Sequence, residues 1–190
     1  GVWTWDHLRD PDEAAEAGVP ESWTTLTALA EATRRVSIGP LVLNTGLRHP
    51  GLLANMAATL QQVSGGRLLL GIGAGATPSM AYAREQTALG LEVAGDRVRA
   101  ERVAETAQVL RRLWSGEASS FAGRQFRLDR PSGFLRPDPP PPIIVGGFGP
   151  RMAAIAGRFG DGFNTQAMHP DLAELGRVAR EAHAASGRDP

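Results

Sequence analysis

The 190-residue chain is 42% hydrophobic and 21% charged, so it is long and apolar enough to bury a core. Its 20 basic and 20 acidic residues give a formal net charge of zero, which argues against nucleic acid or an anionic membrane surface as partners. The absence of cysteine excludes disulfides, thiolate metal sites and a thiol nucleophile within this chain. Its apolar stretches fall short of the roughly 20 residues that a membrane span needs, so we expect a cytoplasmic protein that binds a small molecule.

Hydrophobic patterns alternate between strand and helix in the first half of the chain. Leu26, Leu29 and Ala30 recur at the spacing of a helix with one buried face, and the β-branched run from Val36 is typical of a buried parallel strand. The predicted elements are a strand at 2–5, a helix at 23–35, a strand at 36–43, a helix at 50–64 and a strand at 67–73.

The second half repeats this alternation after an interruption. The predicted elements are a helix at 96–114, a hairpin at 119–128, a strand at 143–145, a helix at 150–159, a strand at 162–166 and a helix at 170–186. The segment at about 115–142 contains six prolines and cannot form regular helix, so we expect it to lie outside the core.

Alternating strands and helices predict an α/β fold with a parallel sheet and right-handed crossovers. Five strands are expected, whereas a closed barrel of this kind needs eight. The chain begins within a strand without an initiator methionine and stops in the turn-like run 187–190. We therefore expect it to be part of a longer barrel.

Asp6 and His7 follow the first predicted strand directly. In parallel α/β folds the working residues collect where strands end, and an imidazole beside a carboxylate can carry protons near neutral pH. The alternative is that Asp6 caps the following turn and His7 is a polar surface residue. The two residues alone do not decide between these interpretations.

Two junctions between strands and loops are rich in glycine. The alternate glycines of 71–76 would let a flat ring or a phosphate approach the backbone, although the run lacks the full GxGxxG spacing and a Walker lysine. The run 146–149 leads into a helix that begins at Pro150, where backbone amides and the helix dipole suit a phosphate. The alternative in both cases is a tight turn that needs glycine only for space.

Two other predicted strand ends carry polar side chains. Asn44 follows the strand at 36–43, and Asn164 and Thr165 lie in the last predicted strand. Their amide and hydroxyl groups could contact a ligand over the sheet. They could equally form turns.

The remaining polar and aromatic candidates favour structural roles. His49, His169 and His183 have no carboxylates around them at the spacing of metal ligands, so we expect solvated histidines and no metal site. The arginines of the helix at 96–114 are expected on a solvated face, and Trp114 in the core.

Taken in order, these motifs cover nearly the whole chain, and as an ordered set they are far more specific than any one of them. They resemble the luciferase-like monooxygenase superfamily, most sharply its branch that uses the deazaflavin coenzyme F420. The matching runs are WDH at 5–7, LTALAEAT at 26–33, IGPLV at 38–42, RHP at 48–50, SGGRLLLGIGAG at 64–75, LWSG at 113–116, FAG at 121–123, PIIVGG at 142–147 and DGFN at 161–164.

The resemblance implies a TIM-type (β/α)8 barrel, incomplete in this chain and running from its second strand to the helix after its sixth. It also implies a ring of F420 or FMN over the strand ends, with His7 as the catalytic, proton-handling residue. Leu41 and Val42 fall where the family has a non-prolyl cis peptide behind the ring. The segment at about 115–142 corresponds to an insertion that helps to form the substrate pocket.

By the same resemblance, the run 73–75 lines the cofactor cleft and 146–149 holds the phosphate of the cofactor tail. The full set of expected cofactor-binding residues is Asp6, Leu41, Val42, Asn44, Gly73, Ala74, Gly75, Gly146, Gly147, Phe148, Gly149 and Thr165.

One departure bears on the substrate. The sugar-phosphate dehydrogenases of the deazaflavin branch carry a glutamate where this sequence has Ala76, which argues against that activity. The function we expect is hydride transfer between F420 and a small organic substrate, with a homodimer as an expected assembly. The alternatives are an FMN-dependent luciferase-like monooxygenase and a noncatalytic flavin-binding barrel fragment.

Overall fold

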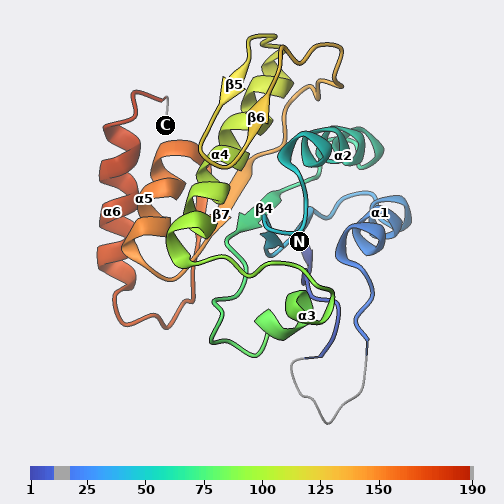
Figure 1. The fold of residues 1–190 in the computed structure, drawn as a ribbon. Coiled ribbons are helices and arrows are strands. Elements are labelled where there is room, and N and C mark those ends of the chain that lie inside the picture. Colours follow the sequence, from blue (N-terminus) through green and yellow to red (C-terminus); the bar gives the residue numbers. More distant parts are fainter. Residues whose placement is uncertain (11–17, 189–190) are drawn as a thin grey trace.

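Strands and helices alternate in this computed structural model, which describes residues 1–10 and 18–188. Figure 1 shows β4 and β7 near the centre, larger helices around them and α3 apart from the other helices. The strands are β1 (Val2–Thr4), β2 (Ile38–Pro40), β3 (Leu43–Asn44), β4 (Leu70–Gly73), β5 (Phe121–Ala122), β6 (Arg127–Leu128), β7 (Ile143–Gly146) and β8 (Gly162–Asn164). The helices are α1 (Ser22–Ala32), α2 (Pro50–Val63), α3 (Ala83–Ala88), α4 (Asp96–Ser115), α5 (Pro150–Phe159) and α6 (Leu172–Ala184).

The sheet is parallel throughout, apart from the separate antiparallel hairpin of β5 and β6. β1 pairs with β2, while β3, β4, β7 and β8 pair in that order. A bridge between Ile38 and Leu68 joins the two groups. The strand predicted at 36–43 is one path in two pieces, β2 and β3, separated by Leu41 and Val42. The α/β prediction and the five predicted strand paths are confirmed.

Two glycines allow neighbouring strands to lie close together. A Cβ atom at Gly71 would collide with the carbonyl oxygen of Pro40, and one at Gly39 would collide with that of Leu69. Because the colliding atoms belong to the backbone, no rotation of a side chain could relieve these contacts. The glycines at these positions are therefore required by the packing of the sheet.

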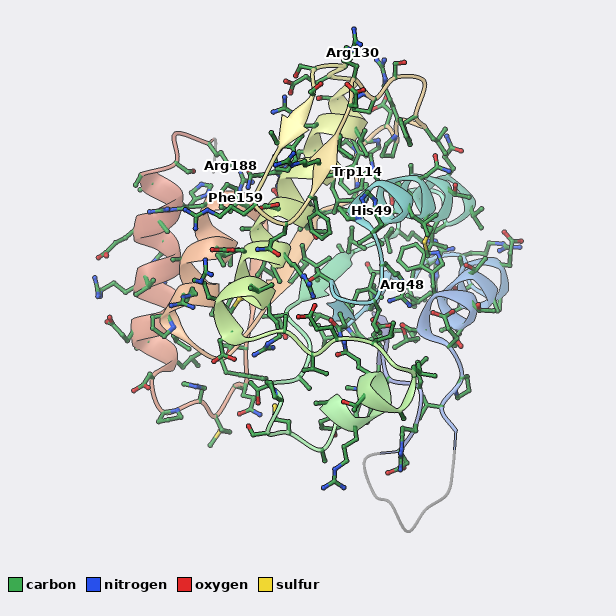
Figure 2. All side chains as sticks on the ribbon, viewed as in Figure 1. Arg48, His49, Trp114, Arg130, Phe159 and Arg188 are labelled. Carbon is green, nitrogen blue, oxygen red and sulfur yellow. The ribbon has the colours of Figure 1, made fainter. Side chains whose placement is uncertain are left out.

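The core lies between the sheet and the helices that cover it. Leu26 of α1, Leu53 of α2 and Leu110 of α4 are fully buried there, and each such side chain contributes roughly 2 kcal/mol through removal from water. The prediction that Trp114 belongs to the core is confirmed: its indole N–H donates to the carbonyl oxygen of Ala54 at 3.0 Å, which joins α4 to α2 (Figure 2).

The two C-terminal helices pack against each other, side by side in Figure 1. A Cβ atom at Gly157 of α5 would collide with the carbonyl oxygen of Ala179 in α6, so glycine sets the close approach of these helices. The bounds predicted for α5 agree with the structure, since Pro150 opens the helix and Gly160 follows its last residue.

The predicted hairpin is present and is tied to α4. The buried carboxylate of Glu105 accepts hydrogen bonds from the backbone N–H groups of Arg124, Gln125 and Phe126, at 2.8 to 2.9 Å. A Cβ atom at Gly123 would collide with the same carboxylate. One glutamate therefore holds the turn between β5 and β6 in place.

Two helix predictions differ from the structure. α1 ends at Ala32 rather than at 35. Thr33 has an extended backbone, and the guanidinium of Arg67 donates hydrogen bonds to the carbonyl oxygens of Ala30 and Thr33. α3 was not predicted, since six residues are too few to display a helical period. None of the helices within 1–10 and 18–188 is long and apolar enough to cross a membrane. The last two residues of the turn at 187–190 lie outside the described part.

We expect Gly71→Ala to lower the free energy of unfolding by at least about 2 kcal/mol, because the new methyl group would force the β2 backbone away. Gly18→Ala is the matched control, since no atom of residues 1–10 or 18–188 lies within 4 Å of the added atom, and its effect should stay within about 0.5 kcal/mol. Denaturant unfolding of both variants measures this difference. Equal stabilities would contradict the close strand packing.

Candidate active site

The strand ends form one row across the sheet. Asn44, Gly73, Gly146 and Asn164 are register partners on β3, β4, β7 and β8. Asp6, just after β1, reaches the same edge, because its carboxylate accepts the backbone N–H of Asn44 at 2.8 Å. The early acid and the later glycines therefore lie at a common edge, as parallel strands require.

Asp6 takes part in a buried ion pair with Arg48. Two guanidinium nitrogens of Arg48 donate to the two carboxylate oxygens of Asp6 at 2.8 and 2.9 Å, and the side chains are 13% and 3% exposed. Burial alone would lower the pKa of Arg48, but the hydrogen bonds and charge of Asp6, aided by Glu21, raise it. Asp6 is thus held inside the protein rather than acting as a cap of the next turn.

Arg48 also links this pair to the start of α1. It donates to Glu21 at 2.8 Å, and Glu21 is the N-cap residue that accepts the N–H groups of Trp23 and Thr24. Burial by itself would raise the pKa of Glu21, but these backbone hydrogen bonds and the Arg48 bond outweigh it, so the pKa is lowered. Arg48 thereby joins the end of β1 to the start of α1.

His7 is held by α3. Its Nδ1 lies 2.8 Å from Oε1 of Glu85, while Oε2 of Glu85 accepts the backbone N–H of Leu8 at 2.8 Å. The ring of Tyr82 stacks on the imidazole at 4.3 Å between centroids. His7 remains partly exposed, whereas Glu85 is buried. The imidazole is therefore oriented by the protein and still accessible at one side.

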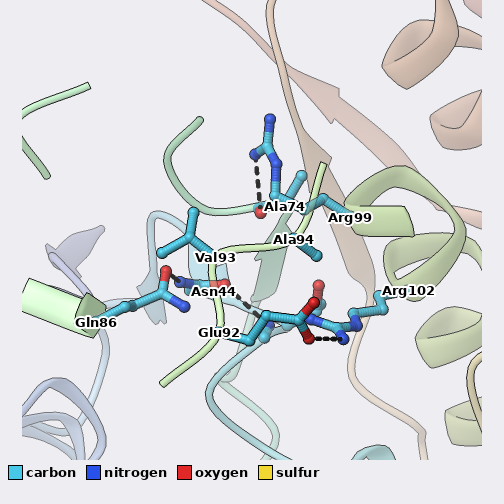
Figure 3. Close-up of a pocket in the computed structure, with 10 residues that line it drawn as sticks. Asn44, Ala74, Gln86, Glu92, Val93, Ala94, Arg99 and Arg102 are labelled. Carbon is cyan, nitrogen blue, oxygen red and sulfur yellow. Dashed lines mark hydrogen bonds and ion pairs between the residues drawn. The ribbon is translucent and has the colours of Figure 1, made fainter. Parts of the chain in front are cut away.

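The side chain of Asn44 is fixed by Gln86, the residue after Glu85 on α3. Its side-chain amide donates to Oε1 of Gln86 at 2.8 Å, and its oxygen accepts the N–H of Gly46 (Figure 3). The same side chain lies 2.5 Å from the position of a Cβ at Gly75, whose φ of +69° also demands glycine. With both polar atoms engaged, Asn44 supports the strand-end loop.

Sequence reasoning missed several members of this site. Glu85 and Gln86 lie on α3 and Tyr82 is its N-cap residue, in a segment for which no element was predicted. Arg48 belongs to the RHP run at 48–50, but its ion pair with Asp6 spans 42 residues and has no local signal. The α3 segment offered no periodic pattern that could have revealed it.

The peptide bond between Leu41 and Val42 is cis, as the resemblance implied. The side chain of Val42 occupies the space beside two strand-end glycines: a Cβ at Gly73 would lie 2.5 Å from it, and one at Gly146 would lie 2.9 Å away. Packing around Val42 therefore accounts for both glycines. Glycine at these positions does not by itself require a ligand.

The loop after β4 is held by α4. Arg99 donates to the carbonyl oxygens of Ala74 at 3.1 Å and Gly75 at 2.7 Å. The expectation of a solvated arginine face on this helix was wrong for Arg99 and Arg102, whose side chains are 11% and 22% exposed, because the helix turns these residues toward the strand ends. The hollow they border in Figure 3 encloses only about 10 Å³, room for about one water rather than a flat cofactor.

The run 146–149 divides into two parts. A Cβ at Gly147 would collide with Met152, and the N–H of Gly147 already donates to the carbonyl oxygen of Asn164 at 3.0 Å. Gly149, by contrast, has open space around a Cβ position and is the N-cap of α5, where no side chain supplies a cap. The exposed Phe148 lies between them. Packing therefore accounts for glycine at position 147, whereas it does not account for glycine at position 149.

Thr165 follows β8 and is the last predicted site residue at this edge. Its hydroxyl oxygen is buried and has no hydrogen-bond partner within the described residues. A buried hydroxyl without a partner is costly, so a ligand or a water that accepts its hydrogen would stabilise this position.

A larger cavity of about 370 Å³ opens next to Asn44. Thr45 and Gly46 form the wall nearest the sheet, Arg102 comes from α4, and Gln125 and Phe126 come from the turn of the hairpin. This volume lies within the range of small-molecule sites, about 300–1,000 Å³. The segment at 115–142 therefore contributes to a cavity beside the strand ends.

We expect Asp6→Asn to destabilise the chain by about 3 kcal/mol, because it leaves the buried guanidinium of Arg48 without its main counter-charge. Asp129→Asn is the matched control, since the Asp129 side chain is 89% exposed, and it should change stability by less than about 0.5 kcal/mol. Denaturant unfolding compares the two. A small loss for Asp6→Asn would show that the pair adds little.

The lowered pKa of Glu21 predicts how its contribution to the stability of the chain changes at acidic pH. The stability that ionised Glu21 contributes should be present above its ordinary pKa of 4.5 and should disappear as the pH falls through the lower folded value. The difference in unfolding free energy between the wild type and Glu21→Gln should therefore shrink in acid. Unfolding curves recorded across this pH range measure it, and a difference that grows in acid would contradict the assignment.

Known proteins place the chain in a family. The family model described as luciferase-like monooxygenase matches residues 1–190. An F420-dependent hydroxymycolic acid dehydrogenase of Mycobacterium tuberculosis is 36% identical over all of this chain and 51% of its own length. An F420-dependent glucose-6-phosphate dehydrogenase of Nakamurella multipartita is 35% identical over 86% of this chain and 47% of its own length.

A solved F420-dependent secondary alcohol dehydrogenase, in complex with an F420-acetone adduct, matches all of this chain and 56% of its own, with a TM-score of 0.84 and 28% identity. The chain thus spans about half the length of these relatives, which agrees with an incomplete (β/α)8 barrel. On this evidence the chain belongs to the luciferase-like monooxygenase family.

Proposed function

We propose that this chain forms the cofactor-bearing part of an F420-dependent oxidoreductase that oxidises or forms a hydroxyl-bearing carbon of a small organic substrate. The carrying observation is the oriented, partly exposed imidazole of His7 at the strand ends. The relatives named above support F420, because each is described as F420-dependent, and two are named for an alcohol or a hydroxylated acid. The cavity walled by 115–142 is the proposed substrate pocket.

In this proposal a flat cofactor with a phosphorylated tail would lie over the strand ends, outside the hollow of about 10 Å³ beside Arg99. The backbone at Leu41 and Val42 would lie behind the ring. The open N-terminus of α5 at Gly149 and the unpartnered hydroxyl of Thr165 would receive the tail. When bound, F420 supplies a ring that accepts or donates a hydride. The chain supplies position and electrostatics.

His7 has the task of moving one proton. Oxidation of an alcohol removes a hydride from carbon and a proton from oxygen, so that the carbon is oxidised and the cofactor reduced. Nε2 of His7 would accept the hydroxyl proton, and would return it in the reverse direction. Asp6, engaged by Arg48, holds the segment that carries His7.

The proposed substrate is not a sugar phosphate. Position 76 carries alanine, so the acid found there in sugar-phosphate dehydrogenases is missing. Both arginines that line the proposed pocket are paired with carboxylates: Arg48 with Asp6 at 2.8 Å, and Arg102 with Glu92 at 3.5 Å. A neutral alcohol or ketone fits these surroundings better. Location in the cytoplasm and a homodimer stay predictions.

We expect the natural full-length protein to bind F420 at least about tenfold more tightly than FMN, a difference of about 1.4 kcal/mol. His7→Asn should leave F420 binding unchanged and lower turnover of a secondary alcohol by about 10²- to 10⁴-fold, the usual contribution of a general base. Fluorescence titration and steady-state kinetics provide the two readouts.

His169→Asn is the control, because His169 lies in the loop before α6 and its Nδ1 accepts a local hydrogen bond from the backbone N–H of Asp171. It should alter neither binding nor turnover. Tight binding of FMN without affinity for F420 would replace the proposal by the monooxygenase alternative. Binding of F420 with no effect of His7→Asn on turnover would leave the cofactor assignment intact and remove His7 from the chemistry.

A further inference from the structure

We propose that Glu85 is a positioning residue, which fixes the orientation and the tautomer of His7 so that Nε2 is the nitrogen offered to the substrate. The proposal rests on the function proposed above, in which His7 moves a proton. It concerns a residue of α3 that has no counterpart among the expected site residues. The geometry of the carboxylate, its burial and the packing of the ring each support it.

The first observation is that both oxygens of Glu85 are engaged at one place. Oε1 meets Nδ1 of His7 at 2.8 Å, and Oε2 accepts the backbone N–H of Leu8 at 2.8 Å. These two partners are consecutive in the chain, so the carboxylate forms hydrogen bonds with the side chain of one residue and the backbone of the next. The plane of the carboxylate and the position of the imidazole are thereby fixed together.

The second observation concerns the proton between the two groups. The Glu85 side chain is only 5% exposed, whereas His7 is 29% exposed. An ionised carboxylate has acceptors only, so a hydrogen bond to Nδ1 requires that Nδ1 carry the hydrogen. In the neutral ring the other nitrogen, Nε2, then holds the free lone pair, because the bond made by one nitrogen decides the state of the other.

The third observation is that Tyr82, the N-cap residue of α3, packs against the face of the His7 ring. Tyr82 lies three residues before Glu85 and stacks on the imidazole with an interplanar angle of 29°. Trp5 meets the ring edge-on at 6.4 Å between centroids. The neighbouring Asp6 carboxylate is engaged by Arg48 and is not needed to orient His7.

The position of α3 is maintained independently of His7. Gln86 is 4% exposed and accepts the side-chain amide of Asn44 at 2.8 Å. Glu85 and Gln86 therefore attach one short helix to two different strand ends. This arrangement allows docking of α3 to be separated from orientation of the imidazole by changing one residue or the other.

The test is the tautomer of His7, read from the ring ¹⁵N chemical shifts in the natural full-length protein with labelled histidine. Spectra are recorded without cofactor at mildly alkaline pH, where an ordinary imidazole is neutral. His7→Asn assigns the signal. The wild type should show the Nδ1–H form, and a predominant Nε2–H form in the wild type would overturn the proposal without any further variant.

Glu85→Ala should convert His7 to a mixture rich in the Nε2–H form and lower turnover about 10- to 100-fold, the size of effect known for partners that orient metal-binding imidazoles. F420 affinity should stay unchanged, so the loss should appear in kcat. Glu85→Gln should give an intermediate result, because the amide keeps one acceptor oxygen and presents an NH2 donor in place of the other, so it cannot reproduce both contacts of the carboxylate with His7 and Leu8.

Two controls separate orientation from stability. Gln86→Leu loosens α3 at Asn44 and should leave the His7 tautomer unchanged, whereas Glu31→Gln, on the exposed face of α1, should change neither the tautomer nor turnover. A tautomer that is the same in the wild type and in Glu85→Ala would overturn the proposal. If F420 fails to bind while the tautomer responds to Glu85, the proposed function falls and the positioning role stands.

Discussion

The arrangement of the strand ends depends on one buried ion pair, that of Asp6 and Arg48. The carboxylate of Asp6 also accepts the backbone N–H of Asn44, and Arg48 also holds Glu21 at the start of α1. A charge taken out of water is tolerated only when all its hydrogen-bonding capacity is met, and here three segments meet it. The segment that carries His7 is consequently fixed relative to β3 and to α1.

The glycines of the site have separable physical roles. Gly73 and Gly146 make room for Val42, Gly75 takes a left-handed conformation beside Asn44, and Gly147 accommodates Met152. Gly149 has no such neighbour. Most of the glycine pattern thus serves to bring protein groups close together. Gly149, at the start of α5, is the glycine of this set that packing within the described residues does not explain.

The helix α3, which was not predicted from the sequence, fixes polar side chains of the site by hydrogen bonds. Glu85 and Gln86 are adjacent in sequence, and each completes the hydrogen bonding of a different strand end. A buried polar network of this kind is rigid when every member is satisfied. It leaves the imidazole of His7 as the partly exposed group at the centre of the proposed chemistry.

The alternation of strands and helices, the five strand paths and the hairpin could be predicted from the residues alone, because hydrophobic periods and glycine or proline boundaries are local signals. The ordered motifs also identified the family correctly. The contacts of Arg48 with Asp6, of Glu85 with His7 and of Arg99 with the loop after β4 became known from the three-dimensional fold, since they join residues 24 to 78 positions apart. Such contacts arise when separate strand ends converge at one edge of a sheet, and no local pattern records which side chains will meet there.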